Sequence, residues 1–215
     1  MPEESSQDPQ SLLPAVSILI AGLNQVEATR RAIRACVATQ ERDRSEIIVA
    51  DYGSKDGGAF LDAEFSTITM LRLPHHIGWT RAMNIASRTA KAELLLMISP
   101  DVELGPTVIP SLISVLEASP EAAAACPLLV DPTGKPVPQA MKLPDANSMK
   151  LACRGELPAS VASTTEALSS VEYPRREAVM LRKQFLRGIN NFDERFGEFW
   201  ADADLAFQIR RANKK

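Results

Sequence analysis

The sequence predicts an α/β fold in which a mostly parallel central sheet is flanked by helices on both faces. Short apolar, β-branched runs alternate with amphipathic segments in the first half of the chain, and a polar loop follows most of these runs. Strands that alternate with helices in this way form parallel sheets with right-handed crossovers. The length of 215 residues, 45% of them hydrophobic, suits one domain with a substantial core.

The first half supplies four strands and their connections. Residues 15–21 (AVSILIA) read as a buried strand because they are apolar and β-branched. The next segment, 27–40, has its apolar residues at helical spacing. The same cycle then repeats along the chain, as a strand at 46–50, a glycine-rich loop at 51–58, a short helix at 59–64, a strand at 68–73, a loop at 74–78, a helix at 79–91 and a strand at 93–98.

The second half is less regular, and residues 1–14 are expected to be a disordered leader. After the leader, residues 15–215 are expected to form the single domain. Residues 131–136 (DPTGKP) have turn chemistry, since proline and glycine preset the backbone angles. The other predicted elements are a helix at 108–118, a strand at 122–130, an irregular region at 137–175 with a short helix around Met149, a strand at 177–181, a loop at 189–200 and a final helix containing Leu205 and Ile209.

Composition excludes several classes of protein. The net charge of -3 gives no basic field for nucleic acid, so no nucleic-acid partner is expected. The three cysteines, Cys36, Cys126 and Cys153, have no metal-site or disulfide-framework spacing, which favours a reducing, cytoplasmic location. No apolar stretch approaches the roughly 18 to 20 residues of a membrane-spanning helix, and the acidic N-terminus does not resemble a signal peptide.

Acidic residues follow two of the predicted strands. Asp51 comes directly after the second strand, where a glycine-rich loop allows close approach of a ligand; the alternative is a tight turn in which Asp56 caps the next helix. Asp101 and Glu103 follow the fourth strand, and oxygen ligands of this kind suit Mg²⁺ or Mn²⁺ completed by substrate phosphates. The alternative for this pair is a proline-containing turn with both acids in water.

A third acidic site precedes the last helix, in FWADADLAF. Asp202 and Asp204 lie near the aromatic pair Phe199 and Trp200, and one of these carboxylates could serve as a general base with a raised pKa. It could equally be a helix N-cap, and the two roles are compatible. The two histidines, His75 and His76, are adjacent in an extended loop, so a two-histidine metal site is not expected.

Four blocks in order resemble the family 2 nucleotide-sugar glycosyltransferases, which have the GT-A fold. VSILIAGLN resembles the family's first strand and loop, and EIIVADYGSKDGG is similar to its valine-aspartate loop. LPHHIGWTRAMNIASRTAKAELLLMISPDVEL resembles its Asn-x-Gly-Phe helix followed by the Asp-x-Asp region. FDERFGEFWADADLAFQIRRA resembles the block that ends in Glu-Asp-x-Asp-Leu.

The resemblance implies an inverting glycosyltransferase that moves a sugar from a nucleotide diphosphate sugar donor to an acceptor hydroxyl. Residues 15–104 would be the nucleotide-binding half and residues 105–215 the acceptor-side half. The acceptor would be a saccharide or lipid-linked molecule in polysaccharide or glycolipid assembly, with possible peripheral membrane association. The implied roles are nucleobase contact by Asp51, nucleotide lining by Ala21 and Asn24, ribose and diphosphate contact by the helix of Gly78 and Asn84, binding of Mg²⁺ or Mn²⁺ by Asp101 helped by Glu103, and general base catalysis by Asp202.

Besides Leu23, which stands where tyrosine is usual, four positions depart from the family pattern: Ser99, His76, Met83 and Ala201. They support an alternative function, a catalytically weak or inactive relative that binds nucleotide or acts as a scaffold. A nucleotidyltransferase is a further alternative, but AGLNQVEATRR is a poor match to the glycine- and arginine/lysine-rich loop of that class. The chain has no Gln-x-x-Arg-Trp motif of processive synthases, so the transferase is expected to be nonprocessive.

Overall fold

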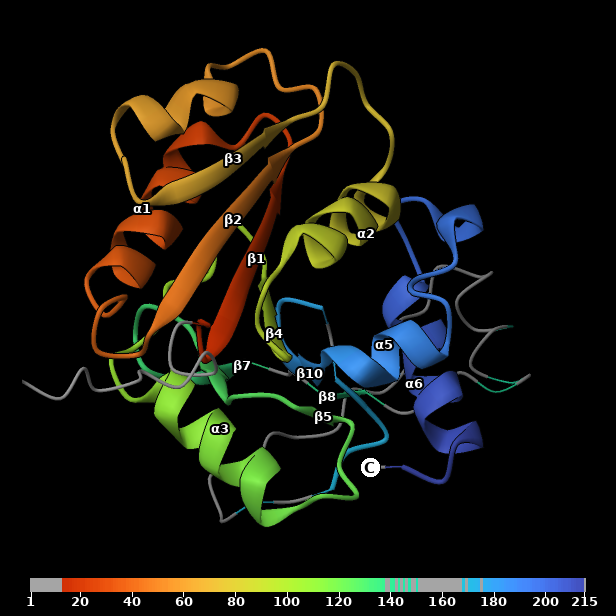
Figure 1. Cartoon of the computed structure of the whole chain (residues 1–215). Coiled ribbons are helices and arrows are strands. Elements are labelled where there is room, and N and C mark those ends of the chain that lie inside the picture. Colours follow the sequence, from red (N-terminus) through yellow and green to blue (C-terminus); the bar gives the residue numbers. More distant parts are fainter. Residues whose placement is uncertain are drawn as a thin grey trace, which may run out of the picture.

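The computed structural model describes residues 13–137, 140–141, 143, 145, 147, 150, 168, 170–174 and 176–214. Its centre is a six-stranded sheet with the order β3-β2-β1-β4-β10-β5 (Figure 1). The strands are β1 (Val16–Gly22), β2 (Ser45–Asp51), β3 (Ile68–Arg72), β4 (Leu94–Ile98), β5 (Ala124–Ala125) and β10 (Ala178–Arg182). The first four are parallel, and β10 runs antiparallel to β4 and β5, which confirms the mostly parallel sheet.

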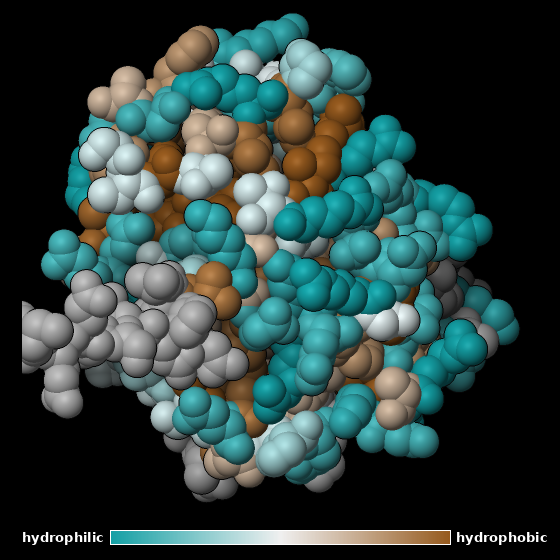
Figure 2. All heavy atoms as spheres, in the orientation of Figure 1, coloured by the Kyte–Doolittle hydropathy of each residue, from teal (hydrophilic) through white to brown (hydrophobic). Residues whose placement is uncertain are grey.

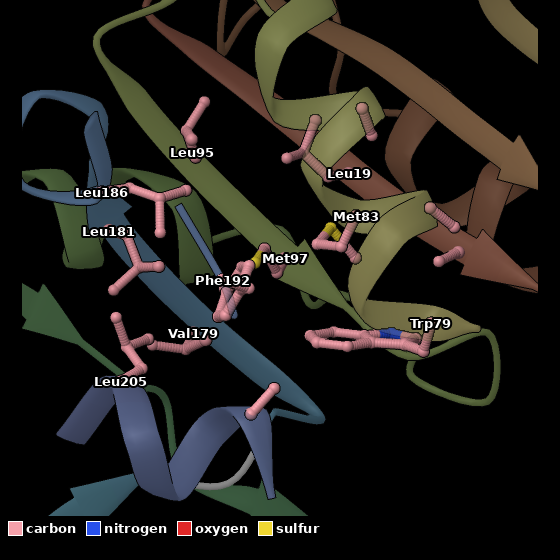
Figure 3. Packing of buried hydrophobic residues seen from close by; sticks show 14 of the residues in the cluster. Leu19, Trp79, Met83, Leu95, Met97, Val179, Leu181, Leu186, Phe192 and Leu205 are labelled. Atoms are coloured by element: carbon pink, nitrogen blue, oxygen red, sulfur yellow. The ribbon is translucent and has the colours of Figure 1, made fainter. Parts of the chain in front are cut away.

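Helices pack on both faces of the sheet, as predicted. They are α1 (Val26–Val37), η2 (Gly58–Ala63), α2 (Trp79–Thr89), α3 (Val108–Ala118), α5 (Lys183–Gly188), η3 (Glu194–Phe196) and α6 (Ala201–Arg211). One core cluster joins the sheet to α1, η2 and α3, and a second joins it to α2, α5 and α6. In the second cluster Trp79, Met83, Phe192 and Leu205 surround the side chains of β4 and β10 (Figure 3). The outward surfaces of α2 and α5 are mainly hydrophilic (Figure 2).

The predicted strand at 122–130 is wrong as a single element. Only β5 and β6 (Leu129–Val130) are strands there. Pro127 lies between them and lacks the N–H that a sheet ladder needs. Beyond it, β6 pairs with β7 (Pro136–Val137) across the predicted turn, where Gly134 has a φ of 84°.

Two further differences concern the second half. The sequence reading missed the short helices α5 and η3. Within the region predicted to be irregular, β8 (Ala140–Met141) pairs with β9 (Tyr173–Pro174). In the helix predicted around Met149, Asn147 and Lys150 are helical, whereas Met149 itself lies outside the described residues, as do residues 1–12 of the predicted leader. No helix in the described part of the chain is long and apolar enough to cross a membrane.

The strand order places the candidate site. β1 lies between β2 and β4, and the chain goes on from β2 to β3 on one side and reaches β4 on the other. The strand order therefore reverses at β1. In open parallel sheets, ligands bind beyond the carboxyl ends of the strands at such a reversal. The loops after β1, β2 and β4 are thus brought to one edge.

Candidate active site at the carboxyl edge of the sheet

The loops after β1 and β2 are bound to each other. Asn24, with a φ of 54°, donates its backbone N–H to the Ser54 hydroxyl at 2.9 Å. Its side-chain oxygen accepts the Lys55 N–H at 2.8 Å. Asp56 accepts the N–H of Val26, the first residue of α1, at 2.8 Å and that of Gly58 at 3.0 Å. Asp56 therefore caps α1 as well as bonding the start of η2, which the sequence reading had not foreseen.

Asp51 ends β2 beside Gly22 of β1 and is only 4% exposed. Its Oδ1 accepts the N–H groups of Gly53 at 3.2 Å and Ser54 at 3.0 Å. These bonds orient the carboxylate before any ligand arrives. Ala21, also expected to line the nucleotide, is a buried β1 residue one position before Gly22.

Gly53 fixes how the loop after β2 meets the loop after β3. Its φ is +102°, and a Cβ built there would lie 2.7 Å from the carbonyl carbon of His75. No L side chain fits without moving backbone, so glycine is required by both conformation and space. Tyr52, the residue before it, is largely buried, and burial together with the charge of Glu198 raises its pKa to about 12.

The start of α2 is closed by the segment 197–198. Gly78 precedes the helix with a φ of +86°, and a Cβ on it would lie 3.4 Å from Gly197 Cα. The Trp79 N–H donates to Glu198 Oε1 at 2.9 Å, and the Thr80 N–H donates to the Gly197 carbonyl at 2.9 Å. The first free N–H groups of α2 are thus satisfied by residues more than one hundred positions later in the chain.

Asn84 lies on α2 but is 1% exposed. Its amide donates to the Phe192 carbonyl at 2.9 Å and lies 3.3 Å from Glu194 Oε1, while its oxygen accepts the Phe192 N–H at 3.0 Å. The structure therefore places its side chain between α2 and the segment that follows α5. Arg81, from the same helix, forms an ion pair with Glu194 at 2.9 Å, which lowers the pKa of that carboxyl group.

Asp101 is exposed in a turn directly after β4. The turn is held by the Ser99 N–H, which donates to the Glu177 carbonyl at 2.9 Å, and by the Val102 N–H, which donates to the Ser99 carbonyl at 3.0 Å. The buried Pro100 reaches the end of β1, since its Cγ would lie 3.8 Å from a Cβ on Gly22. Asp51 and Asp101 therefore lie on either side of the end of β1.

Glu103 is engaged by a basic side chain of α1. It forms an ion pair with Arg31 of α1 at 3.2 Å, and both side chains are more than half exposed. In the part of the chain that the structure describes, no three His, Cys, Asp or Glu side chains are close enough to hold a metal. One exposed carboxylate still fits a Mg²⁺ or Mn²⁺ ion that takes its other ligands from phosphates and water.

Asp202 is the second residue of α6 and half-buried, with its Oδ1 accepting the Ala203 N–H at 3.0 Å. The expected N-cap position is instead taken by Trp200, whose φ is 70°. Asp202 and Asp204 are acids in the first turn and suit the positive end of the helix dipole. Asp204 lines a polar pocket of about 420 Å³ between α2, the 189–195 segment and α6.

The sequence reading missed Glu198 as a site residue. It lies in the loop before α6, where it contacts the loops after β2 and β3 and the start of α2. A single glutamate in a polar loop carries no periodicity or motif. The only available signal was its position close to Asp202 in the sequence.

Comparison with known proteins identifies the family of the chain. The matching family model is described as glycosyl transferase family 2 and covers residues 17–166, more than half of the chain. An N-acetylglucosaminyl-diphospho-decaprenol L-rhamnosyltransferase from Mycobacterium tuberculosis is 26% identical, over 77% of this chain and 61% of the relative. The chain therefore spans less than two thirds of that relative's length.

Two solved structures share the fold. The mannosyltransferase PcManGT from Pyrobaculum calidifontis, in complex with GDP-Man and Mn²⁺, gives a TM-score of 0.65 at 16% identity, over 100% of this chain and 57% of its own. TarS from S. aureus, in complex with UDP, gives 0.66 at 15% identity, over 90% of this chain and 54% of its own. With its GT-A fold and the match of the family model over most of its length, this chain belongs to glycosyl transferase family 2.

Proposed function

We propose that this protein is an inverting, nonprocessive glycosyltransferase that moves a sugar from a nucleotide diphosphate sugar to an acceptor hydroxyl. The observation that carries the proposal is the convergence of Asp51, Asp101 and the segment leading to Asp202 on one edge of a family 2 domain. Residues 15–104 would bind the donor, and residues 105–215 would contribute the acceptor side.

For the donor, we assign nucleobase contact to Asp51, with Ala21 and Asn24 lining the nucleotide. The preformed hydrogen bonds of Asp51 support this role, because an oriented carboxylate can accept a base N–H without reorganising. Gly78 and Asn84 belong to the helix assigned to the ribose and diphosphate. The interaction of Asn84 with Phe192 supports an indirect contribution, in which Asn84 holds the wall of the site.

Asp101 would hold Mg²⁺ or Mn²⁺, which would neutralise charge developing on the leaving diphosphate. The exposure of Asp101 at the end of β4 supports this assignment. Glu103 stays a second candidate ligand that would first have to leave Arg31. The complex of PcManGT with GDP-Man and Mn²⁺ is consistent with a metal in this fold.

Asp202 would act as the general base. The acceptor hydroxyl would lose its proton to Asp202 while its oxygen forms a bond to the anomeric carbon. The bond from that carbon to the diphosphate oxygen would break with its electron pair, and the nucleoside diphosphate would leave. Attack from the face opposite the leaving group inverts the anomeric centre.

The acceptor would be a saccharide or lipid-linked molecule in cell-envelope polysaccharide or glycolipid assembly. The named activity of the mycobacterial relative, on a diphospho-decaprenol, supports a lipid-linked acceptor. Phe199 and Trp200, just before Asp202, are 69% and 45% exposed and could contact a lipid or sugar ring. Peripheral membrane association and a cytoplasmic location, the latter based on cysteine spacing, are part of the same proposal.

The test combines binding with turnover. Calorimetric titration with UDP, GDP and dTDP, each with and without Mn²⁺, should give micromolar binding of one nucleotide that depends on Mn²⁺. The matching nucleotide sugars are then assayed with diphospho-prenol-linked and free saccharide acceptors. Transfer with inversion supports the proposal. Absence of binding by every nucleotide would instead favour the inactive scaffold.

A further inference from the structure

Glu198 is the meeting point of three segments that surround the candidate donor site. Its Oε1 accepts the Trp79 N–H at 2.9 Å and lies 2.9 Å from His76 Nε2. Its Oε2 lies 3.5 Å from the Tyr52 hydroxyl. Tyr52 directly follows Asp51, and the Tyr52 and His76 rings are 5.6 Å apart. One carboxylate thus contacts the loop after β2, the loop after β3 and the start of α2.

The backbone around Glu198 is anchored as firmly as its side chain. The Gly197 carbonyl accepts both the N–H and the hydroxyl of Thr80. The Glu198 carbonyl accepts a hydrogen bond from the Arg176 guanidinium, which also stacks over the Trp79 ring at 4.8 Å. These contacts fix the segment 197–198 against α2 from both sides.

The carboxylate suits this place electrostatically. A negative charge at a helix N-terminus is stabilised by the helix dipole and by the N–H groups that lack partners within the helix. The Glu198 side chain is 28% exposed, so its contacts are only partly screened by solvent. A shorter or uncharged apolar side chain at 198 would leave the Trp79 N–H without this partner.

The anchored segment leads directly to Asp202. Gly197 and Trp200 both have positive φ, at 59° and 70°, so the chain follows a tightly bent path into α6. The Trp200 carbonyl accepts the Asp204 N–H at 3.0 Å and begins the helix. Because this path is short and bent, a shift at Glu198 is transmitted to the first turn of α6, which carries Asp202.

We propose that Glu198 is a positioning residue that sets Asp202 against the donor site by tying the segment before α6 to α2 and to the loops after β2 and β3. The inference rests on the proposed transferase function, since Asp202 matters as a base only there. The length of the Glu198 side chain and its hydrogen-bond acceptance set this position, whereas its charge contributes only to stability at the start of α2.

Three variants separate reach from charge. Glu198→Gln keeps the length of the side chain and an oxygen acceptor for Trp79 and His76. Glu198→Asp keeps the charge but withdraws the carboxylate by about 1.5 Å, one carbon–carbon bond. Glu198→Ala removes both. Asp131→Ala is the matched control, because it removes a carboxylate that caps backbone N–H groups in the turn between β6 and β7.

The proposal predicts that Glu198→Gln keeps kcat within about threefold of the original. Glu198→Asp and Glu198→Ala should lose about 10- to 100-fold in kcat, since a 1 Å misplacement of a reacting group costs on that order. The Kd of the nucleoside diphosphate should change less than about threefold in all of them. Asp131→Ala should leave kcat and Kd unchanged at a comparable thermal stability.

A direct structural readout accompanies the kinetics. Amide hydrogen exchange at Ala203, whose N–H is bound by Asp202, should accelerate in Glu198→Asp and not in Glu198→Gln or Asp131→Ala. If Glu198→Gln is the inactive variant and Glu198→Asp the active one, Glu198 acts through its charge and the proposal is overturned. Unchanged exchange at Ala203 in Glu198→Asp overturns it as well. If the unmutated protein transfers no sugar, the proposed function fails, while the exchange measurement still decides whether Glu198 holds the start of α6.

Discussion

Replacing Asn84 by alanine should destabilise the protein more than removing any one exposed side-chain contact of α2 would. Asn84 is 1% exposed, and it satisfies both the N–H and the carbonyl of Phe192, at 3.0 Å and 2.9 Å. Phe192 is itself buried, and its ring packs edge-on against Trp79 at 5.5 Å. The alanine variant leaves two buried backbone groups without their side-chain partner, beside the polar pocket between α2, the 189–195 segment and α6.

The magnitude follows from these two groups. An unsatisfied buried donor or acceptor costs about 1 to 3 kcal/mol, so two of them cost about 2 to 6 kcal/mol. Because both groups border a pocket that admits water, Asn84→Ala should lower the free energy of unfolding by about 2 to 4 kcal/mol, the lower part of that range. With a urea slope of about 3 kcal/mol/M, the unfolding midpoint would fall by about 1 M. Equilibrium urea unfolding followed by tryptophan fluorescence measures this shift directly.

Ser87→Ala is the matched control. Ser87 is equally buried on α2, but its hydroxyl donates to the Asn84 carbonyl at 3.0 Å, a bond within the helix. Its loss should cost under about 1 kcal/mol, since the net value of one such bond is small. If Asn84→Ala and Ser87→Ala destabilise equally, the link from α2 to Phe192 does not contribute as argued.

An isosteric variant sharpens the test. Asn84→Asp keeps an acceptor for the Phe192 N–H but turns the donor toward the Phe192 carbonyl and Glu194 into an acceptor. Burial and the neighbouring acid would raise the pKa of the new carboxyl group in the folded state. Its ionisation therefore costs stability at high pH, and the penalty relative to Asn84 should shrink as pH falls from 8 to 5. A penalty that grows as pH falls would refute this account.

Three further predictions concern the site itself. Asp202→Asn should lower kcat by about 10²- to 10⁴-fold, the usual range for a general base, with nucleotide affinity nearly unchanged by calorimetry; full activity would remove Asp202 from the mechanism. Asp101→Asn should abolish the Mn²⁺ dependence of nucleotide binding. Glu103→Gln removes the ion pair with Arg31 and should leave that dependence largely intact. Equal effects of the two variants would make Glu103 a ligand. Gly53→Ala should lower the free energy of unfolding by about 1 to 3 kcal/mol, because a Cβ at this position would lie 2.7 Å from the backbone of the loop after β3. Unchanged thermal stability would contradict that contact.

The periodicity of the first half predicted its elements well. The strand expected at 93–98 and the helix expected at 79–91 correspond to β4 and α2. Local signals suffice there, because a fully apolar run can only be buried and an amphipathic segment shows which face it buries. The strand expected at 122–130 failed because Pro127 interrupts the ladder.

The candidate site also has features that the sequence predicts and features that only the structure shows. Asp51 and Asp101 could be predicted to share one edge, because the carboxyl ends of parallel strands meet at the same edge of a sheet. The ion pair of Glu103 with Arg31 could not be foreseen, since it joins residues whose sequence separation carries no pattern. The same holds for the hydrogen bonds of Asn84 to Phe192.

The sequence by itself determined the alternation of strands and helices, the mostly parallel sheet and the family blocks that point to sugar transfer. Those properties are local or repeat along the chain, so they can be predicted without knowing which distant residues are in contact. Only the tertiary structure decided which partners engage the individual acids. In the structure Glu198 accepts the first N–H of α2, Asp202 lies in the first turn of α6, and Glu103 pairs with Arg31 of α1. Such pairings depend on distances between segments far apart in the chain, which no local pattern encodes.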